Sequence, residues 1–506
     1  MIQLTKEKLD QYDQRTIGEL AELAAPALRH RQACWRRVIR KYDPNTFMGN
    51  NETGERVIIP FEYYIVKMFS GYVGGKAPMY NVAPPSDTNI YSTGILGRIN
   101  KRLGTGKAID RKKQEYIEEY QAQITRIQKY NDDASLFFQV VKSYAATNAA
   151  FLYIFQEENT QEIRYVLFDS QQTESICDES TPPQLIGAVR TWVNSDKRQV
   201  IEKITAERYQ QYIQGETGFE LEKDEPLAWG DAPIVAFENP DCVTVFEPSL
   251  GEIEAYEESE NNVKNMTQYN DSDAKLLISG YSDPLPPMTQ ETETGEYRKS
   301  PEREAFEKAL IKARTLFVGQ DGDIRWLLKD ISYDGILAVQ ARRHDNITML
   351  SGVPNMTDEA FSNADNASAL GYKLYAMDQY AADLDRELKK GYLRLWEIIT
   401  NRLNLIDKRY NFRDIQITLQ RNIPTDKDKS IARGISLFKS GAVSQETAIN
   451  EMQIEVDAKD EIERVKAEKD AEYTEAIQRG EQQEMPINNS ETDPESGRGN
   501  DRSNVQ

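Results

Sequence analysis

The stretch SGVPNMTDEAFSNADNASALGYKLYAMDQYAADLDRELKKGYLRLWEIITNRLNL, residues 351–405, decides the architecture of this chain. It opens with a polar, turn-forming segment and continues as a long amphipathic pattern. About 40 residues at 1.5 Å each predict a helical rod roughly 55–60 Å long. A single apolar stripe on such a rod needs a large domain or a neighbouring copy to cover it. Its members recur at spacings of three and four, as one helix face requires: Leu370, Leu374, Met377, Ala381, Leu384, Leu388, Tyr392, Leu395, Ile399 and Leu403.

The segment before this helix is polar and turn-forming, and its composition alone is that of an ordinary loop before a capped helix; its residues are candidates only through the family resemblance that they help to carry. Asp365 or Asn366 can cap the helix, because either side chain can accept a hydrogen bond from an N–H group of the first turn. The candidate residues of the segment are Pro354, Asn355, Met356, Thr357, Asp358, Glu359, Phe361, Asn363, Asp365 and Asn366.

Length and charge limit the classes of protein that fit. A chain of 506 residues can bury a large core and is expected to hold more than one domain. The net charge of -21 argues against a protein that grips nucleic acid through its phosphates, which takes clustered Lys and Arg. The negative charge is compatible with a channel through which DNA slides, because a channel wall of like charge repels the DNA polyanion. It fits an acidic soluble protein equally well.

Cysteine number and hydropathy bear on the compartment. Cys34, Cys177 and Cys242 are odd in number and far apart, which indicates reduced thiols. No apolar run approaches 18 residues, and the start of the chain lacks a signal pattern. We therefore expect a soluble protein made in a cytoplasm, with no membrane partner.

The N-terminal half is expected to pass from helices to a β-rich region. Residues 1–40 have helical periodicity and end in a basic tail, residues 29–42, which suits nucleic acid or acidic neighbours in an oligomer. Residues 84–134 are predicted to be a peripheral insertion that contains one helix. Period-two patterning over 160–240 predicts an antiparallel meander. Other predicted helices are Phe61–Tyr72, Glu115–Lys129 and Leu136–Tyr144; predicted strands are Ala149–Phe155, Ile163–Phe168, Leu185–Val193, Val200–Tyr212 and Ile234–Phe237.

In the second half of the chain, long predicted helices alternate with short predicted strands and a hairpin. A helix is expected from Pro248 to about Asn270, then a strand over 275–280 and a flexible, polar run through 299. A helix from Ser300, a hairpin of 316–318 with 323–328, and a helix over 333–350 follow. After the long helix come a strand over 415–419 and two helices, 426–440 and 444–452, which are split at Gly441. Residues 486–506 are expected to be disordered.

Signals for chemistry are weak. The two histidines, His30 and His344, lie on Arg-rich helical stretches, and no Cys and His spacing suits zinc. No glycine-rich phosphate loop is present. Asp271 and Asp273 could attract a cation, but no turn gathers oxygens around them. We predict no catalytic residue, no cofactor and no metal site.

Several motifs, taken in order, resemble those of the portal proteins of long-tailed double-stranded DNA phages, the siphovirus-type portal family. They are NMTDEAF at 355–361 and NASAL at 366–370 before the long helix, APIVAFENPD at 232–241, and GAVSQETAI at 441–449, where Ile449 replaces the usual Leu. The resemblance covers roughly residues 50–480.

The resemblance implies an α+β portal fold with a helical stem, a long backbone helix, a β-rich wing, a small α/β clip and a helical crown, assembled as a ring. The implied regions are an N-terminal and wing region 1–245 (meander about 150–240), first stem helix 246–272, clip 273–331, second stem helix 332–350, tunnel loop 351–366, long wing helix 367–405, crown 406–480 and disordered tail 481–506.

The same resemblance implies a function. A ring of twelve copies at one capsid vertex would pass double-stranded DNA during packaging and ejection. Its implied partners are the terminase large subunit, head-completion or neck proteins, scaffold and the major capsid protein. The protein would be assembled in the host cytoplasm and reside in the virion. The clip would dock partners through Tyr281, Pro284, Pro286, Asp321, Asp323 and Trp326.

Two questions stay open at this point. The helical stripes are expected to bury against neighbouring subunits, and Arg342–Arg343 can bridge subunits or line the tunnel, with bridging favoured because Arg forks pair well with carboxylates. The alternative function is an oligomeric capsid-associated scaffold or interaction protein with no DNA conduit.

Overall fold

The computed structural model describes most of the chain and divides it into two compact units, Met1–Asn422 and Ile423–Gln506. The described residues are 2–40, 57–84, 105–268, 275–279, 288–290, 297–299, 301, 305, 323–327, 333–355, 367–405, 409–422, 427–441, 443–452, 461–462 and 464–469. Helices and strands are both abundant, so the predicted α+β class is confirmed.

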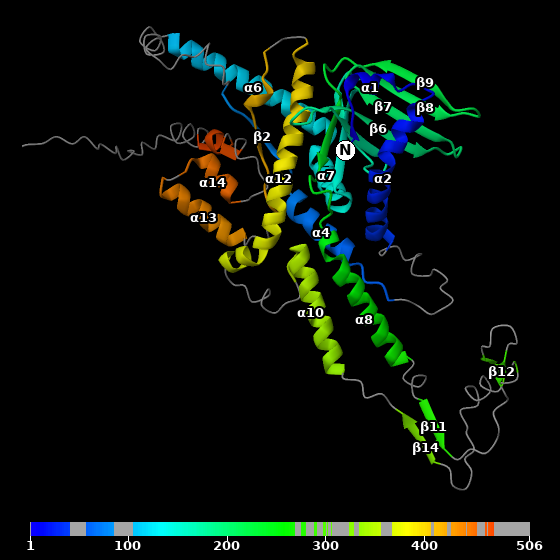
Figure 1. Ribbon diagram of the computed structural model, residues 1–506. Helices are drawn as coiled ribbons and strands as arrows, with labels where there is room; N and C mark the ends of the chain where they lie inside the picture. The colour runs from blue at the N-terminus through cyan, green and yellow to red at the C-terminus, as the bar shows by residue number, and fades with distance from the viewer. Residues whose placement is uncertain are drawn as a thin grey trace, which may run out of the picture. The chain divides into compact units, whose positions relative to one another are not determined.

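The helices are named in chain order (Figure 1). They are α1 (Lys6–Gln11), α2 (Ile17–Arg40), α4 (Phe61–Gly74), α6 (Thr105–Asn131), α7 (Asp133–Thr147), the 3-10 turn η1 (Glu247–Ser249), α8 (Leu250–Gln268), α10 (Tyr333–Ser351), α12 (Ala367–Leu403), the 3-10 turn η2 (Phe412–Asp414), α13 (Lys427–Lys439) and α14 (Gln445–Glu451).

The strands form several sheets, of which the largest has the order β1-β5-β6-β7-β8-β9. A second sheet has the order β10-β3-β4, and β2 pairs with β15. The strands are β1 (Ile2–Gln3), β2 (Met79–Val82), β3 (Ala149–Gln156), β4 (Ile163–Phe168), β5 (Thr173–Cys177), β6 (Leu185–Val193), β7 (Gln199–Thr205), β8 (Arg208–Gln214), β9 (Phe219–Pro226), β10 (Ile234–Glu238), β11 (Lys275–Ser279), β12 (Met288–Gln290), β13 (Tyr297–Lys299), β14 (Asp323–Leu327) and β15 (Ile415–Thr418).

The N-terminal segment covers one face of the large sheet. Leu9, Ile17 and Leu20 are almost fully buried and pack with sheet residues such as Val189 and Ile201. The predicted helix over 1–40 is interrupted, because the Asp13 carboxylate accepts hydrogen bonds from the N–H groups of Arg15 (2.8 Å) and Thr16 (3.3 Å) and so builds a turn between α1 and α2. Ahead of it, β1 pairs parallel with β5.

Helix α12 supplies the centre of an aromatic core. Tyr392 and Trp396 are fully buried, and their rings lie 5.3 Å from Phe237 and from Tyr80, respectively. Phe137 of α7 lies 5.8 Å from Tyr392. From Leu374 to Ile399 the predicted stripe is buried, but it is covered within the same chain. Of the two alternatives for covering this stripe, the large domain is the one observed, because residues of β2, α7 and β10 pack against it. The expectation that this stripe is buried against neighbouring subunits is therefore wrong.

Gly391 of α12 permits this packing, which yields a stability prediction. A Cβ atom at this position would lie 2.3 Å from Cε1 of the buried Phe237. We expect Gly391→Ala to lower the free energy of unfolding by about 1–3 kcal/mol, as overpacking does. Gly71 of α4 has open space around its own added Cβ, so Gly71→Ala should raise stability by up to about 1 kcal/mol through helix propensity. Urea denaturation of both variants checks the opposite signs; equal effects would contradict the packing argument.

Three features of the predicted meander need correction. The single strand over 200–212 is the hairpin β7–β8, whose turn is held by Thr205, since its Oγ1 accepts the N–H of Arg208 at 3.1 Å. Strand β9 went unpredicted because its charged residues are exposed and show no apolar alternation. Strands β4 and β10 both pair with β3 in the second sheet and not with the meander.

Predictions for segments outside the two large sheets also need correction. The helix of 105–131 is no peripheral insertion, because Tyr120 and Ile124 are fully buried and the Tyr120 hydroxyl lies 2.7 Å from Thr400 Oγ1. Strand β14 pairs with β11, while its expected partner 316–318 lies outside the described residues. The run expected to be flexible contains the pair β12–β13.

In the second unit, the predicted helical pair is confirmed. Gly441 adopts a φ of +70° between α13 and α14, and the Ser444 Oγ atom accepts the N–H of Thr447 at 3.2 Å as a helix cap. The expected tail 486–506 lies outside the described residues. Within the described part of the chain, no helix is both long and apolar enough to cross a membrane.

Candidate functional site

The helices α8 and α10 run side by side and lead into the candidate segment (Figure 1). Asn346 Nδ2 donates to Glu252 Oε1 at 3.1 Å across the pair. The His344 ring lies 6.5 Å from Tyr256 of α8 and 5.9 Å from Phe61 at the start of α4. The three elements therefore meet through an aromatic cluster, which makes His344 a packing residue.

The end of α10 is tied to α12. Gly352 adopts a φ of +68°, and a Cβ there would lie 2.6 Å from the ring of Tyr380. The Tyr380 hydroxyl donates to the Leu350 carbonyl oxygen at 3.1 Å. Val353 is buried, and with Ile347 it lines a cavity of about 270 Å³ against α4. The chain therefore leaves α10 at Gly352, whose backbone is in the left-handed region. The Tyr380 hydrogen bond and the buried Val353 hold the start of the following segment in place.

Helix α12 is held in turn by Arg421. Its guanidinium binds Asp385 through two bonds of 2.8 and 3.0 Å and donates from Nε to Asp378 at 3.0 Å. The Tyr72 hydroxyl of α4 donates to the same Asp378 at 3.3 Å. Burial and the neighbouring Asp378 raise the pKa of Tyr72 to about 12, which keeps this donor protonated. A bidentate Arg–carboxylate pair fixes geometry as well as distance.

The structure describes only part of the sequence-predicted site. Of the polar segment, Pro354 and Asn355 are described and half-buried; Met356, Thr357, Asp358, Glu359, Phe361, Asn363, Asp365 and Asn366 lie outside the described residues. Of the clip candidates, Asp323 and Trp326 lie in β14, opposite Ser279 and Leu276, and Tyr281, Pro284, Pro286 and Asp321 lie outside them. Their roles stay predictions.

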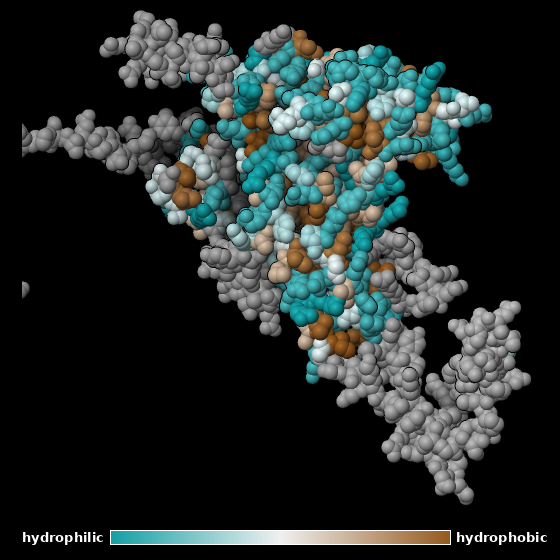
Figure 2. All heavy atoms as spheres, in the orientation of Figure 1, coloured by the Kyte–Doolittle hydropathy of each residue, from teal (hydrophilic) through white to brown (hydrophobic). Residues whose placement is uncertain are grey.

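Helix α10 presents apolar side chains to solvent. Leu337 is 61% exposed and Met349 is 68% exposed, and Figure 2 shows hydrophobic residues at the surface of the α8–α10 pair. Arg342 is exposed, whereas Nη1 of Arg343 is buried without a hydrogen-bond partner among the residues that the structure describes. An exposed apolar helix face is typical of a surface that another chain covers, whereas the buried Arg343 nitrogen is out of reach of another chain.

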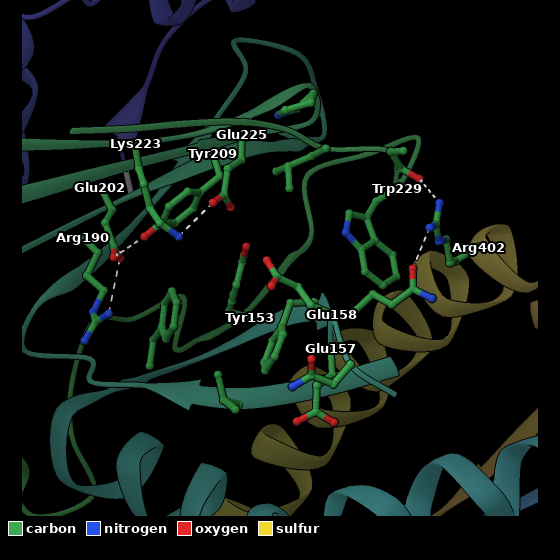
Figure 3. Close-up of a pocket in the computed structure, with 18 residues that line it drawn as sticks. Tyr153, Glu157, Glu158, Arg190, Glu202, Tyr209, Lys223, Glu225, Trp229 and Arg402 are labelled. Carbon is green, nitrogen blue, oxygen red and sulfur yellow. Dashed lines mark hydrogen bonds and ion pairs between the residues drawn. The ribbon is translucent and has the colours of Figure 1, made fainter. Parts of the chain in front are cut away.

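A cavity of about 720 Å³ between the two large sheets and the end of α12 was not anticipated (Figure 3). Tyr153 and Phe168 stack in its wall at 5.0 Å. Two ion pairs lie in its wall: Arg190 lies 3.3 Å from Glu202, and Lys223 lies 2.8 Å from Glu225. Arg402, which also lines the cavity, donates to the Ala228 carbonyl oxygen at 3.1 Å and to Gln156 Oε1 at 2.6 Å. These contacts within the chain indicate a structural role for the wall.

Comparison with known proteins identifies relatives. The family model described as phage portal protein, SPP1 Gp6-like, matches residues 36–475. No curated protein sequence matches the chain.

Among solved structures, the neck of a native GTA particle computed with C12 symmetry is 12% identical, with a TM-score of 0.38 and coverage of 84% of this chain and 94% of that one. The neck of an empty GTA particle computed with C6 symmetry is 11% identical, with a TM-score of 0.35 and coverage of 78% and 90%.

Proposed function

The chain belongs to the phage portal protein family, SPP1 Gp6-like, and from this premise we propose that it forms a ring-shaped channel at one capsid vertex. Double-stranded DNA would pass through this ring during packaging and ejection. The family match over residues 36–475 carries the proposal. The family is structural, so the ring supplies no hydrolysis, and the terminase large subunit that docks on it drives the DNA.

The proposed regions follow the element order. Helices α8 and α10 form the stem, residues 273–331 the clip that docks terminase and then neck proteins, and residues 351–366 the tunnel loop. The long helix 367–405 carries the wing, and residues 406–480 form the crown. The contact of α8 with α10 and the tied end of α10 support this assignment, because a loop that meets moving DNA needs a fixed base.

The negative net charge of the chain supports the proposed DNA channel. The net charge of -21 makes the ring a poor binder of phosphates, and the loop residues Asp358 and Glu359 would repel DNA that approaches the tunnel wall. The loop would therefore act as a soft gasket around the duplex. Twelve copies, scaffold and the major capsid protein complete the proposed assembly in the virion.

Native mass spectrometry with negative-stain imaging of the purified protein tests the ring. We expect a closed ring of about a dozen subunits with a central hole. A monomer that stays monomeric with scaffold present, or a particle without a hole, would instead favour the capsid-associated interaction protein.

The exposed face of α10 provides a variant for the same measurement. Leu337→Glu should abolish or strongly reduce ring formation while leaving the monomer folded, because this side chain is 61% exposed in the single chain. Leu221→Glu is the matched control, since Leu221 is 42% exposed on the edge strand β9, and it should assemble normally. Normal rings from Leu337→Glu would remove α10 from the subunit contact.

A further inference from the structure

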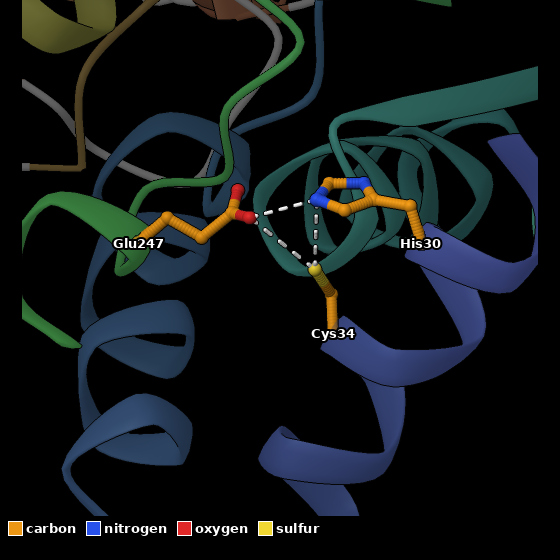
Figure 4. Close-up of side chains that lie close together, drawn as sticks. All are labelled: His30, Cys34 and Glu247. Carbon is orange, nitrogen blue, oxygen red and sulfur yellow. Dashed lines mark hydrogen bonds and ion pairs between the residues drawn. The ribbon is translucent and has the colours of Figure 1, made fainter. Parts of the chain in front are cut away.

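Three side chains with metal-binding atoms meet between α2 and η1 (Figure 4). His30 and Cys34 are four residues apart and share one face of α2. Glu247 comes from η1, 213 residues beyond Cys34. Nε2 of His30 lies 2.8 Å from Glu247 Oε1, and Sγ of Cys34 lies 3.7 Å from that oxygen and 3.8 Å from Nε2.

The surrounding structure orients the carboxylate. The backbone N–H of Thr244 donates to Glu247 Oε2, which leaves Oε1 turned toward α2. One turn further along α2, Arg37 pairs with Glu254 of α8 at 2.8 Å and keeps α2 beside α8. A ligand oriented by such an outer partner is the usual arrangement at metal centres.

Exposure differs among the three groups in a way that suits metal entry. Cys34 is 5% exposed, whereas the side chain of His30 is 43% exposed. A cation can therefore reach the cluster past His30 while the sulfur stays shielded below. Solvent on the His30 side supplies water for a further coordination position.

We propose that Nε2 of His30, Sγ of Cys34 and Oε1 of Glu247 bind a zinc-class divalent cation, with water as the fourth ligand. Ligands at 2.0–2.3 Å in a tetrahedron lie about 3.3–3.6 Å from one another. The three separations fall within about half an ångström of that range, which the exposed His30 ring can adjust. Nitrogen and thiolate donors select zinc over magnesium and calcium.

Binding exchanges protons for the metal. In the metal-free cluster the Cys34 thiol donates to the Glu247 carboxylate, and burial together with Glu247 raises the pKa of this thiol to about 12. In the metal-free cluster Nε2 of His30 also donates a proton to Glu247 Oε1. The incoming cation takes the sulfur and Nε2 lone pairs, the thiol proton leaves to solvent, the proton on Nε2 is displaced, and the bound His30 ring carries its one proton on Nδ1. The product is a metal ion bonded to Cys34 and His30 of α2 and to Glu247 of η1, which joins α2 to the turn from which α8 begins.

The test uses Co²⁺ as a spectroscopic probe on the purified full-length protein. We expect one Co²⁺ per chain, a near-ultraviolet thiolate-to-cobalt charge-transfer band, visible bands typical of four-coordinate cobalt, and displacement of all of them by Zn²⁺. Cys34→Ser should lose the charge-transfer band. Cys242→Ser is the control and should keep it, because Cys242 is an exposed thiol outside the cluster. Absence of the band in the wild type, or its persistence in Cys34→Ser, overturns the proposal.

A second variant tests the same site without changing a buried residue, because replacing the buried Cys34 can also disturb folding. His30→Ala removes an exposed side chain, so the fold should persist by circular dichroism. Its Zn²⁺ affinity, measured by competition with a chelating dye, should fall at least about 100-fold, the upper range of the loss seen when even an outer partner is removed. Equal affinities of His30→Ala and wild type would show that His30, Cys34 and Glu247 form only an ion pair with a neighbouring thiol.

Discussion

Arg31→Met is expected to lower the free energy of unfolding by about 3–5 kcal/mol, the cost of breaking a buried ion pair from one side. The Arg31 side chain is 5% exposed, and its guanidinium lies 2.7 Å from a Glu174 oxygen and 3.2 Å from a Glu238 oxygen. It also donates to the Thr173 carbonyl oxygen at 2.7 Å and lies over the Phe151 ring. One side chain thus joins α2 to both large sheets, and its loss leaves two buried carboxylates without their cation.

The pH dependence of this variant separates lost charge from lost packing. Burial and the charge of Glu174 raise the pKa of Glu238. A carboxyl group whose folded-state pKa is raised contributes stability below its unfolded pKa and loses that contribution as pH rises through the folded value. Without Arg31 this effect grows, so the deficit of Arg31→Met relative to wild type should shrink as pH falls from 7 toward 5.

Urea denaturation at fixed protein concentration measures both effects. Arg37→Met is the matched control on the same helix, because the Arg37–Glu254 pair is 41% and 54% exposed and should be worth less than about 1 kcal/mol. If Arg31→Met and Arg37→Met cost the same, or if the deficit does not depend on pH, the buried network does not hold α2 on the sheets.

Local signals explain which parts of the fold the sequence predicts. The three-and-four spacing from Leu374 to Ile399 marks the buried face of α12. Asn148 ends α7 with a φ of 59°, as expected of a residue that tolerates positive φ. Ser444 caps its helix through a neighbour three residues away. In each case the cause lies within one element, so it is visible in a short window.

Contacts between segments that are distant in the sequence cannot be predicted from patterns within one element. The pairing of β1 with β5 joins residues more than 170 positions apart, and Glu247 meets His30 from 217 positions away. The spacing of His30 and Cys34 shows two donors on one helix face, but no pattern reveals the third. The candidate loop and clip residues came from the resemblance to portal proteins, since their composition alone is that of polar surface.

Deletion of residues 356–363 is the prediction with the largest functional effect. We expect ring assembly to persist and DNA packaging to fall to a small fraction of the wild-type amount, because the proposed gasket around the duplex is removed. Assembly should survive since the base depends on residues outside the deletion: Gly352 ends α10 with a φ of +68°, and Tyr380 holds the Leu350 carbonyl. Negative-stain imaging reports the ring, and nuclease-protected DNA in assembled particles reports packaging.

The length of the remaining connection decides whether this deletion is a fair test. Six residues stay between Gly352 and Ala367, and they can span roughly 20 Å when extended. The helix from Ala367 back to Tyr380 covers roughly the same length at 1.5 Å per residue, so the shortened chain can still join α10 to α12. A second variant, in which 356–363 become a Gly/Ser linker of equal length, keeps the span and removes the side chains. Packaging should fail in both variants if the side chains form the gasket, and full packaging by the deletion variant would eliminate that role.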